Sequence, residues 1–194
     1  MKYSLVLIAC ASALAACNKG PEIHETNASV GDVVNAAHEA GVTTGTFLEA
    51  GQWQLKGTMD EMNMPGLPPS AQAEMKRILG ERQGYTYEYC LTPEEAKRPR
   101  GKFLTGKESD NCKYDHFDMA GGKVDAVMRC EGKPSGTMTM KITGTYSPDS
   151  YTSRVAMEMT GGREGGMTMK MHSEAHRIGE CTGKETKLTI KGRG

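Results

Sequence analysis

From residue 112 onward, apolar and polar residues alternate along the chain with a period of two. This is the pattern of β-strands that bury one face and expose the other. Turns rich in glycine, or with the sequence Ser-Pro-Asp-Ser, divide this part into the segments 112–119, 123–131, 137–146, 151–160 and 167–172. Consecutive short strands joined by such turns predict an antiparallel meander.

The same alternation predicts two earlier strands. One covers 53–59, where Trp53 and Leu55 share a face, and the other covers 85–90, where tyrosines alternate with Thr86, Glu88 and Cys90. Tyrosine and tryptophan are favoured on half-buried strands, which supports both assignments.

Register follows from where the turns are centred. Folding the chain about 147–150, Arg163 and Lys133 places the apolar residues in three cross-strand rows on one face and Thr, Lys, Arg and Glu residues on the other. The rows are Met128, Met138, Met159 and Met167; Ala126, Met140, Met157 and Met169; and Val124, Ile142, Val155 and Met171. A slip of one residue would mix the faces, so we expect this register to be strongly specified.

Helical patterns occur before and between the strands. Apolar residues at helical spacing predict a short N-terminal helix over 30–40. Ser70 can cap a helix that reaches about Arg82 and presents Met75, Ile78 and Leu79 to an apolar surface. The sequence Thr-Pro-Glu-Glu at 92–95 is a capping box, so a helical turn follows it. The predicted fold is mainly β: a curved, half-barrel-like antiparallel meander sheet with helix 70–82 packed on its apolar face.

The first seventeen residues follow another pattern. Lys2 precedes a short apolar run that ends in Leu-Ala-Ala-Cys at 14–17. Such a run before small residues is typical of a secretory signal, and the cysteine resembles that of the bacterial lipobox. We therefore expect cleavage before Cys17 and lipidation of Cys17. By enterobacterial analogy, Asn18 then directs the protein to the periplasmic side of the outer membrane.

These patterns divide the chain into a signal peptide (1–16), a lipidated cysteine with a polar tether and short helix (17–50), a β domain (51–181) and a basic, solvated tail (182–194).

No other apolar run approaches the roughly 18 residues of a membrane span, so we expect an anchored protein, not a membrane-spanning one. Lys plus Arg and Asp plus Glu both number 24, a balance that gives no electrostatic reason to bind nucleic acid.

Four cysteines remain after Cys17, and an even number in an exported chain predicts two disulfides. None is spaced as Cys-x-x-Cys, and three connectivities are open. Centring the turn on Gly121 places Cys112 opposite Cys130, which leaves Cys90 for Cys181. The same register sets an aspartate opposite a core valine, a mismatch that a β-bulge near the turn would repair.

Several motifs, in their order, resemble the bacterial envelope family catalogued as domain of unknown function 3617. They are Gly51-Gln-Trp53, Met62-Asn-Met-Pro-Gly66, Cys90-Leu-Thr-Pro-Glu94, the cysteines Cys112 and Cys130, the Met-Thr-Met rows, and Arg177-Ile-Gly-Glu-Cys181. The resemblance covers about residues 51–181 and implies a secreted or lipid-anchored protein that keeps its four cysteines. It implies no activity, because none is assigned to the family.

Methionines dominate the apolar face and allow three interpretations. They are flexible apolar side chains typical of a core. A face left open on one side would instead hold an acyl chain or another apolar ligand, with helix 70–82 as its plug or gate. Thioethers are also soft ligands, so the Met-x-Met pairs suit copper(I) or silver. The candidate ligand face comprises Met128, Met138, Met140, Met157, Met159, Met167, Met169 and Met171.

Catalytic signals are weak. His172 and His176 lie four residues apart but not in a predicted helix, and alternation puts Asp115 on the opposite face from its neighbour His116. No catalytic sequence motif is present, and paired cysteines leave no thiol nucleophile. We therefore expect no catalytic residue, no His, Asp, Glu or Cys metal site and no cofactor.

The preferred interpretation is a lipid-anchored, non-catalytic module that binds an apolar small molecule or an envelope protein. The alternatives are a structural or protein-interaction lipoprotein of the envelope and a soft-metal binder.

Overall fold

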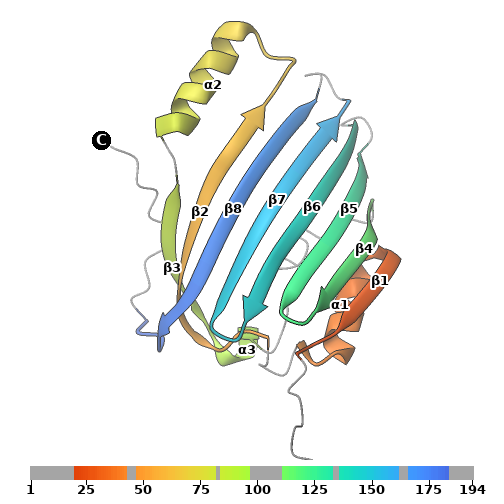
Figure 1. Cartoon of the computed structure of the whole chain (residues 1–194), viewed down its shortest axis with the longest axis vertical. Helices are drawn as coiled ribbons and strands as arrows, with labels where there is room; N and C mark the ends of the chain where they lie inside the picture. The colour runs from red at the N-terminus through yellow and green to blue at the C-terminus, as the bar shows by residue number, and fades with distance from the viewer. Residues whose placement is uncertain are drawn as a thin grey trace, which may run out of the picture.

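The computed structural model describes residues 20–42, 47–81, 84–96, 111–132, 136–161 and 166–183, and its main feature is one antiparallel sheet of eight strands (Figure 1). The strand order is β1-β4-β5-β6-β7-β8-β2-β3, with β1 and β3 at open edges. The strands are β1 (Ile23–Ser29), β2 (Gly51–Asn63), β3 (Tyr85–Leu91), β4 (Cys112–Ala120), β5 (Lys123–Gly132), β6 (Gly136–Ser147), β7 (Ser150–Thr160) and β8 (Met167–Gly179). The predicted mainly β fold, with β4 to β8 as a meander, is confirmed.

The predicted register is confirmed across β6, β7 and β8, where Met140 lies opposite Met157 and Met157 lies opposite Met169. Between β5 and β6 the prediction was wrong by two residues, because Met128 pairs with Met140 and not with Met138. The last pair before this turn is Gly132 with Gly136, so the turn is centred one residue later than Lys133. A shift of two leaves every side chain on its predicted face.

Both predicted disulfides form, Cys112 with Cys130 and Cys90 with Cys181. A bulge is also present, but it lies farther from the turn than expected: the register of β4 against β5 shifts between Tyr114 and His116. The extra residue in β4 returns its apolar side chains to the core-facing side, as a bulge does.

The N-terminal region departs from the prediction. Residues expected in a polar tether form β1, which pairs with β4, for example Ile23 with Met119. Helix α1 (Val30–Glu39) follows directly, and a capping box joins Ser29 to Asp32 at its start. Val33 and Ala37 of α1 are completely buried, so this helix belongs to the core of the β domain.

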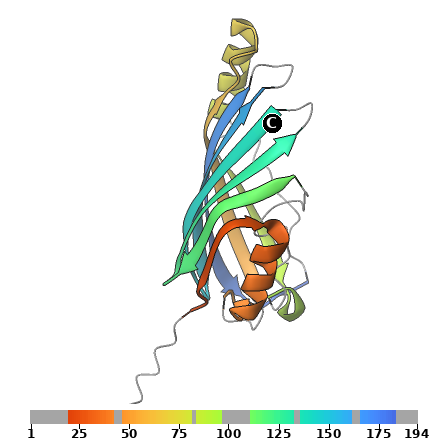
Figure 2. The same cartoon turned by 90° about the vertical axis from the view of Figure 1, so that its right-hand side faces the viewer.

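Helix α2 (Pro69–Glu81) forms as predicted but does not lie over the methionine rows. It stands beyond the end of β2, above the sheet (Figures 1 and 2). The helix contacts that strand only sparsely, and Met75 of α2 lines a small pocket together with Met62, Met64 and Leu67 at the strand's tip. The predicted plug or gate is therefore wrong, and α1 is the helix that packs on the sheet, against β1 and β4. The short α3 (Pro93–Ala96) follows β3, as its capping box predicts.

The core lies on one face of the curved sheet, which we call the inner face. Its largest fully buried side chains are Trp53, Tyr114, Phe117, Met119, Val33 and Val42. Helix α1 lies against one end of this face (Figure 2), and its residues Val30, Val33 and Ala37 belong to this core. The other end carries the methionine rows, and no described helix covers it.

Candidate functional site

The inner face continues the predicted rows across more strands than the sequence indicated. The registers extend them onto β2, where Met62 pairs with Met169 and Met59 with Met171. Running from β5 to β2, the rows are Met128–Met140–Met157–Met169–Met62, then Ala126–Ile142–Val155–Met171–Met59, then Val124–Gly144–Ser153–Ser173–Gly57. Met138, Met159 and Met167 form a further row at the strand ends.

A hollow of about 530 Å³ lies on this face, within the range of roughly 300–1,000 Å³ typical of small-molecule sites. Its apolar lining includes Met140, Met157, Met169, Met171, Ile142 and Val155. These side chains are partly exposed, unlike those of the core. No Lys, Arg, His, Asp or Glu is among the described residues that line the hollow.

A row of small residues crosses the lining of the hollow, where Gly144, Ser153 and Ser173 are neighbours on adjacent strands. The hydroxyls of Ser153 and Ser173 lie 2.8 Å apart and hydrogen-bond to each other. Gly144 is required beside them, because a side chain there would collide with the carbonyl oxygen of Thr152. Gly57 is required at the other end, since the ring of Tyr85 lies where its Cβ would be. The row therefore offers hydroxyl groups between positions that hold no side chain.

An aromatic wall borders the hollow on the side away from the methionines. Tyr151 lines the hollow, and its ring centroid lies 6.0 Å from that of Trp53. Phe47 and Tyr146 also line it, with ring centroids 4.9 Å apart. Burial raises the pKa of Tyr151 far above its usual range, so its phenol stays neutral in any ordinary buffer.

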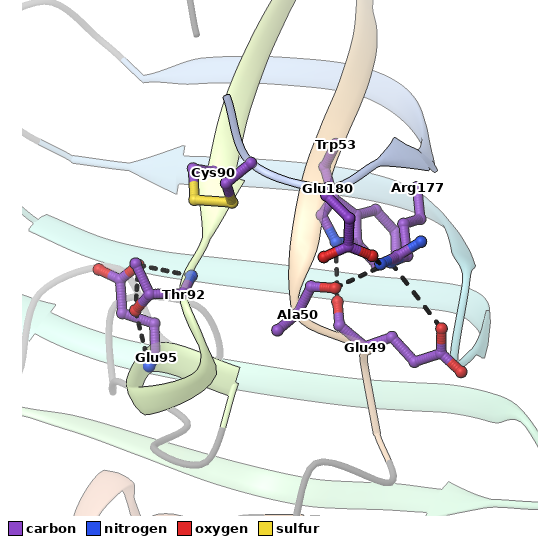
Figure 3. Close-up of a disulfide and its surroundings, with 9 residues drawn as sticks. Glu49, Ala50, Trp53, Cys90, Thr92, Glu95, Arg177 and Glu180 are labelled. Carbon is purple, nitrogen blue, oxygen red and sulfur yellow. Dashed lines mark hydrogen bonds and ion pairs between the residues drawn. A yellow bond between two sulfur atoms is a disulfide. The ribbon is translucent and has the colours of Figure 1, made fainter. Parts of the chain in front are cut away.

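Behind this wall, three of the sequence motifs meet around a disulfide (Figure 3). The indole N–H of Trp53 donates to the carbonyl oxygen of Glu49 at 3.0 Å. Arg177 donates through Nε to the carbonyl oxygen of Ala50 at 2.8 Å and pairs with Glu180. The Cys90–Cys181 bond then ties the end of β3 to the chain that follows β8.

This convergence explains the motif that begins at Gly51. Its backbone has a φ of +145°, which side-chain-bearing residues rarely adopt. A Cβ at Gly51 would also collide with the carbonyl oxygen of Gly179 and the guanidinium of Arg177. The motif residues seen in Figure 3 therefore clamp β2, β3 and β8 together and hold the aromatic wall in place.

The predicted ligand-face methionines divide into three groups. Met140, Met157, Met169 and Met171 line the hollow, whereas Met128 is buried in the core with 3% exposure. Met138, Met159 and Met167 share the face but lie outside the hollow's lining. Sequence reasoning missed the lining residues Ser153, Ser173, Tyr146, Tyr151 and Phe47. All but Phe47 continue the period-two pattern of the methionine rows, which is the signal that marks them.

The four histidines on strands, His24, His116, His172 and His176, lie on the outer face, away from the hollow. His172 Nδ1 lies 2.7 Å from Asp60 Oδ1, and His116 Nε2 lies 2.8 Å from Asp125 Oδ1. These pairs are solvent-exposed, and Asp115 instead accepts a hydrogen bond from Arg129. In the part of the chain that the structure describes, no group of three His, Cys, Asp or Glu residues is placed to hold a metal ion.

Two predictions, the lipidation of Cys17 and the basic tail beyond residue 183, fall outside the described residues. Among the helices that the structure describes, none has the length and apolarity needed to cross a bilayer.

Comparison with known proteins places the chain in a family. Residues 48–181 match the model of the protein family of unknown function DUF3617, and the chain belongs to that family. The match begins after β1 and α1 and ends at Cys181, so it contains the hollow's methionine rows and the clamp around Trp53. No curated protein and no solved structure showed significant similarity to the chain.

Proposed function

We propose that this protein is a lipid-anchored, non-catalytic envelope protein that holds an apolar small molecule in the hollow of its inner face. The observation that carries this proposal is the hollow of about 530 Å³ with partly exposed methionines at its surface. A simple core would seal these side chains, as it seals Met128, which has 3% exposure. Flexible thioether side chains can repack around ligands of varied shape.

The energetics favour a long apolar chain. Each buried CH₂ contributes about 0.8 kcal/mol, so ten of them would contribute about 8 kcal/mol before the cost of immobilising the ligand. That cost is at least about 4 kcal/mol, so ten groups leave at most about 4 kcal/mol, a Kd of about 1 mM, whereas about fifteen groups leave about 8 kcal/mol, a Kd of about 1 μM. A short apolar molecule would gain too little to be retained.

The expected anchor would bring this hollow close to a bilayer. The hydroxyl of Tyr146, which lines the hollow, donates to the carbonyl oxygen of Pro21 at 3.2 Å. Cys17 precedes Pro21 by four residues, a span of at most about 14 Å. A lipid on Cys17 would therefore hold the aromatic wall near the membrane surface, where apolar ligands are abundant.

Native mass spectrometry of the protein, extracted gently from its own membrane, tests this proposal. We expect an added mass of several hundred daltons that disappears on denaturation. Met157→Lys, which places a charge in the hollow, should reduce the ligand-bound fraction by about tenfold or more. Thr137→Lys, on the exposed outer face of β6, is the matched control and should leave it unchanged. A bare mass in every preparation, with two intact disulfides, would refute the proposal.

Soft-metal binding is a second candidate, and the structure adds one observation in its favour. Met62 joins Met140, Met157 and Met169, so one cross-strand row carries thioethers on four neighbouring strands. All four side chains are partly exposed, and thioethers suit copper(I) and silver(I). Titration with silver(I) tests this candidate. A Kd below about 1 μM that Met157→Leu raises would support a metal site in this row. Absence of such binding would rule the metal site out.

A further inference from the structure

We infer that the hollow selects amphiphiles with an uncharged hydroxyl head on a long alkyl chain, such as long-chain alcohols, and holds the head at Ser153 and Ser173. This inference rests on the proposed function and names its ligand class. It follows from the charge, the hydroxyl pair and the length of the inner face.

The absence of charge around the hollow disfavours an ionised head. Its described lining has no cation to pair with a carboxylate or phosphate. Arg177 lies on the same face beyond Ala175, but it is already engaged by Glu180, Glu49 and the carbonyl oxygen of Ala50. Burying an unpaired charge costs far more than burying a hydroxyl that finds a partner. A fatty alcohol is therefore favoured over the corresponding fatty acid anion.

The two serines provide the partner for a hydroxyl. Their mutual bond, 2.8 Å long, uses one O–H donor and leaves the other donor and several lone pairs available. Gly144 beside Ser153 carries no side chain, whereas the ring of Tyr85 lies over Gly57 beside Ser173, so a ligand would reach the serine hydroxyls from the Gly144 side. A ligand hydroxyl placed there can donate and accept at once, as water does.

The methionine rows then set the direction and length of the chain. Val155 and Met157 follow Ser153 on the same face of β7 and line the hollow, and Met159 continues this face beyond the lining. At about 3.3 Å per residue, the four residues from Ser153 to Met157 span about 13 Å within the hollow, and the face continues to about 20 Å at Met159. This matches an extended long alkyl chain that starts at the serines and runs over the thioethers. On the other side of the serines, Tyr151 and Tyr146 form the wall that stops the head.

Displacement of Nile red, a neutral apolar dye, by three matched compounds tests this inference. We expect 1-dodecanol to bind the intact protein at least tenfold more tightly than dodecanoate at pH 8, with dodecane in between. The double substitution Ser153→Ala and Ser173→Ala should weaken 1-dodecanol about fivefold, which corresponds to one lost hydrogen bond, and leave dodecane unchanged. Thr137→Ala, on the outer face, is the control and should change neither.

The outcomes separate this inference from the proposed function. Equal or tighter binding of dodecanoate in the unsubstituted protein would overturn the neutral-head inference while the apolar site remained. A serine variant that folds and still prefers 1-dodecanol by the same factor would overturn the role of the two serines. If neither Nile red nor dodecane binds the unsubstituted protein, the proposed function itself fails.

Discussion

The two disulfides close loops of very different length, which makes their contributions to stability separable. Cys90 and Cys181 are 91 residues apart, whereas Cys112 and Cys130 are 18 apart. In the chain-entropy description, each disulfide lowers the conformational entropy of the unfolded chain. This stabilises the folded state by about 4.6 kcal/mol for Cys90–Cys181 and about 3.2 kcal/mol for Cys112–Cys130. The difference, about 1.4 kcal/mol, depends only on the ratio of the two loop lengths.

Two variants isolate each bond. Replacing Cys112 and Cys130 by alanine leaves only the long loop, and replacing Cys90 and Cys181 leaves only the short one. Each variant is compared oxidised and reduced, so the number of sulfur atoms is constant and the lost packing of Cys112, which is 8% exposed, cancels. The free energy of unfolding is measured by urea titration with the fluorescence of Trp53, the protein's single tryptophan, which is completely buried.

We expect oxidation to stabilise the long-loop variant by about 1.4 kcal/mol more than the short-loop variant, which is a tenfold larger change in the folding equilibrium. Equal gains, or a larger gain for Cys112–Cys130, would refute the entropic reasoning. Stabilisation would then reside in the folded state, where the short loop joins paired residues of β4 and β5.

Three further predictions concern the core, the hollow and alkaline pH. Val33→Ala should lower the free energy of unfolding, measured by urea titration, by about 2 kcal/mol, because Val33 is completely buried. A change below about 0.5 kcal/mol would show that α1 is not part of the core. Gly144→Ala should lower the free energy of unfolding by about 1–3 kcal/mol, because the new methyl group would collide with the carbonyl oxygen of Thr152. Thr143→Ala, at the exposed neighbouring position, is the control and should leave stability nearly unchanged. Equal effects of the two substitutions would contradict the close approach of Thr152 to Gly144. Burial raises the pKa of Tyr89 and Tyr114 from 10.0 to about 12. Between these values the unfolded chain loses protons that the folded chain keeps, so these two phenols should lower the free energy of unfolding as the pH rises from 10 to 12, and less steeply in Tyr114→Phe. Stability that is flat over this window would contradict the burial of these phenols.

Local patterns in the sequence were sufficient for the faces of the strands and for most of the register. The turn at Ser147–Ser150 sits between long alternating segments, and the register centred on this turn places Met140 opposite Met157. The same reasoning located both disulfides, because Cys112 and Cys130 lie opposite each other once a bulge is allowed. The predicted register between β5 and β6 was wrong by two residues. A shift of two residues keeps every side chain on the same face, so the alternation of apolar and polar residues cannot reveal it.

The N-terminal strand had no comparable signal. Only Ile23 and Ala28 of β1 are buried, so its sequence resembles a polar tether. Its partner β4 begins 83 positions after the end of β1, at Cys112 following Ser29, and no local pattern specifies such a pairing. Helix α1 follows this strand directly and packs against β1 and β4, and its buried residues belong to the same core as Tyr114 and Phe117.

The sequence therefore determined which residues share the face of the candidate site, but not whether that face is covered. Periodicity alone assigned the methionines to one face, since the side-chain direction of a strand alternates strictly. Whether that face became a sealed core or an open hollow depended on where the helices packed. Helix α2 is amphipathic in its local pattern, yet it lies past the tip of β2, and α1 covers the β1–β4 end. The choice rests on contacts between residues far apart in the chain, which is why only the tertiary structure decided it.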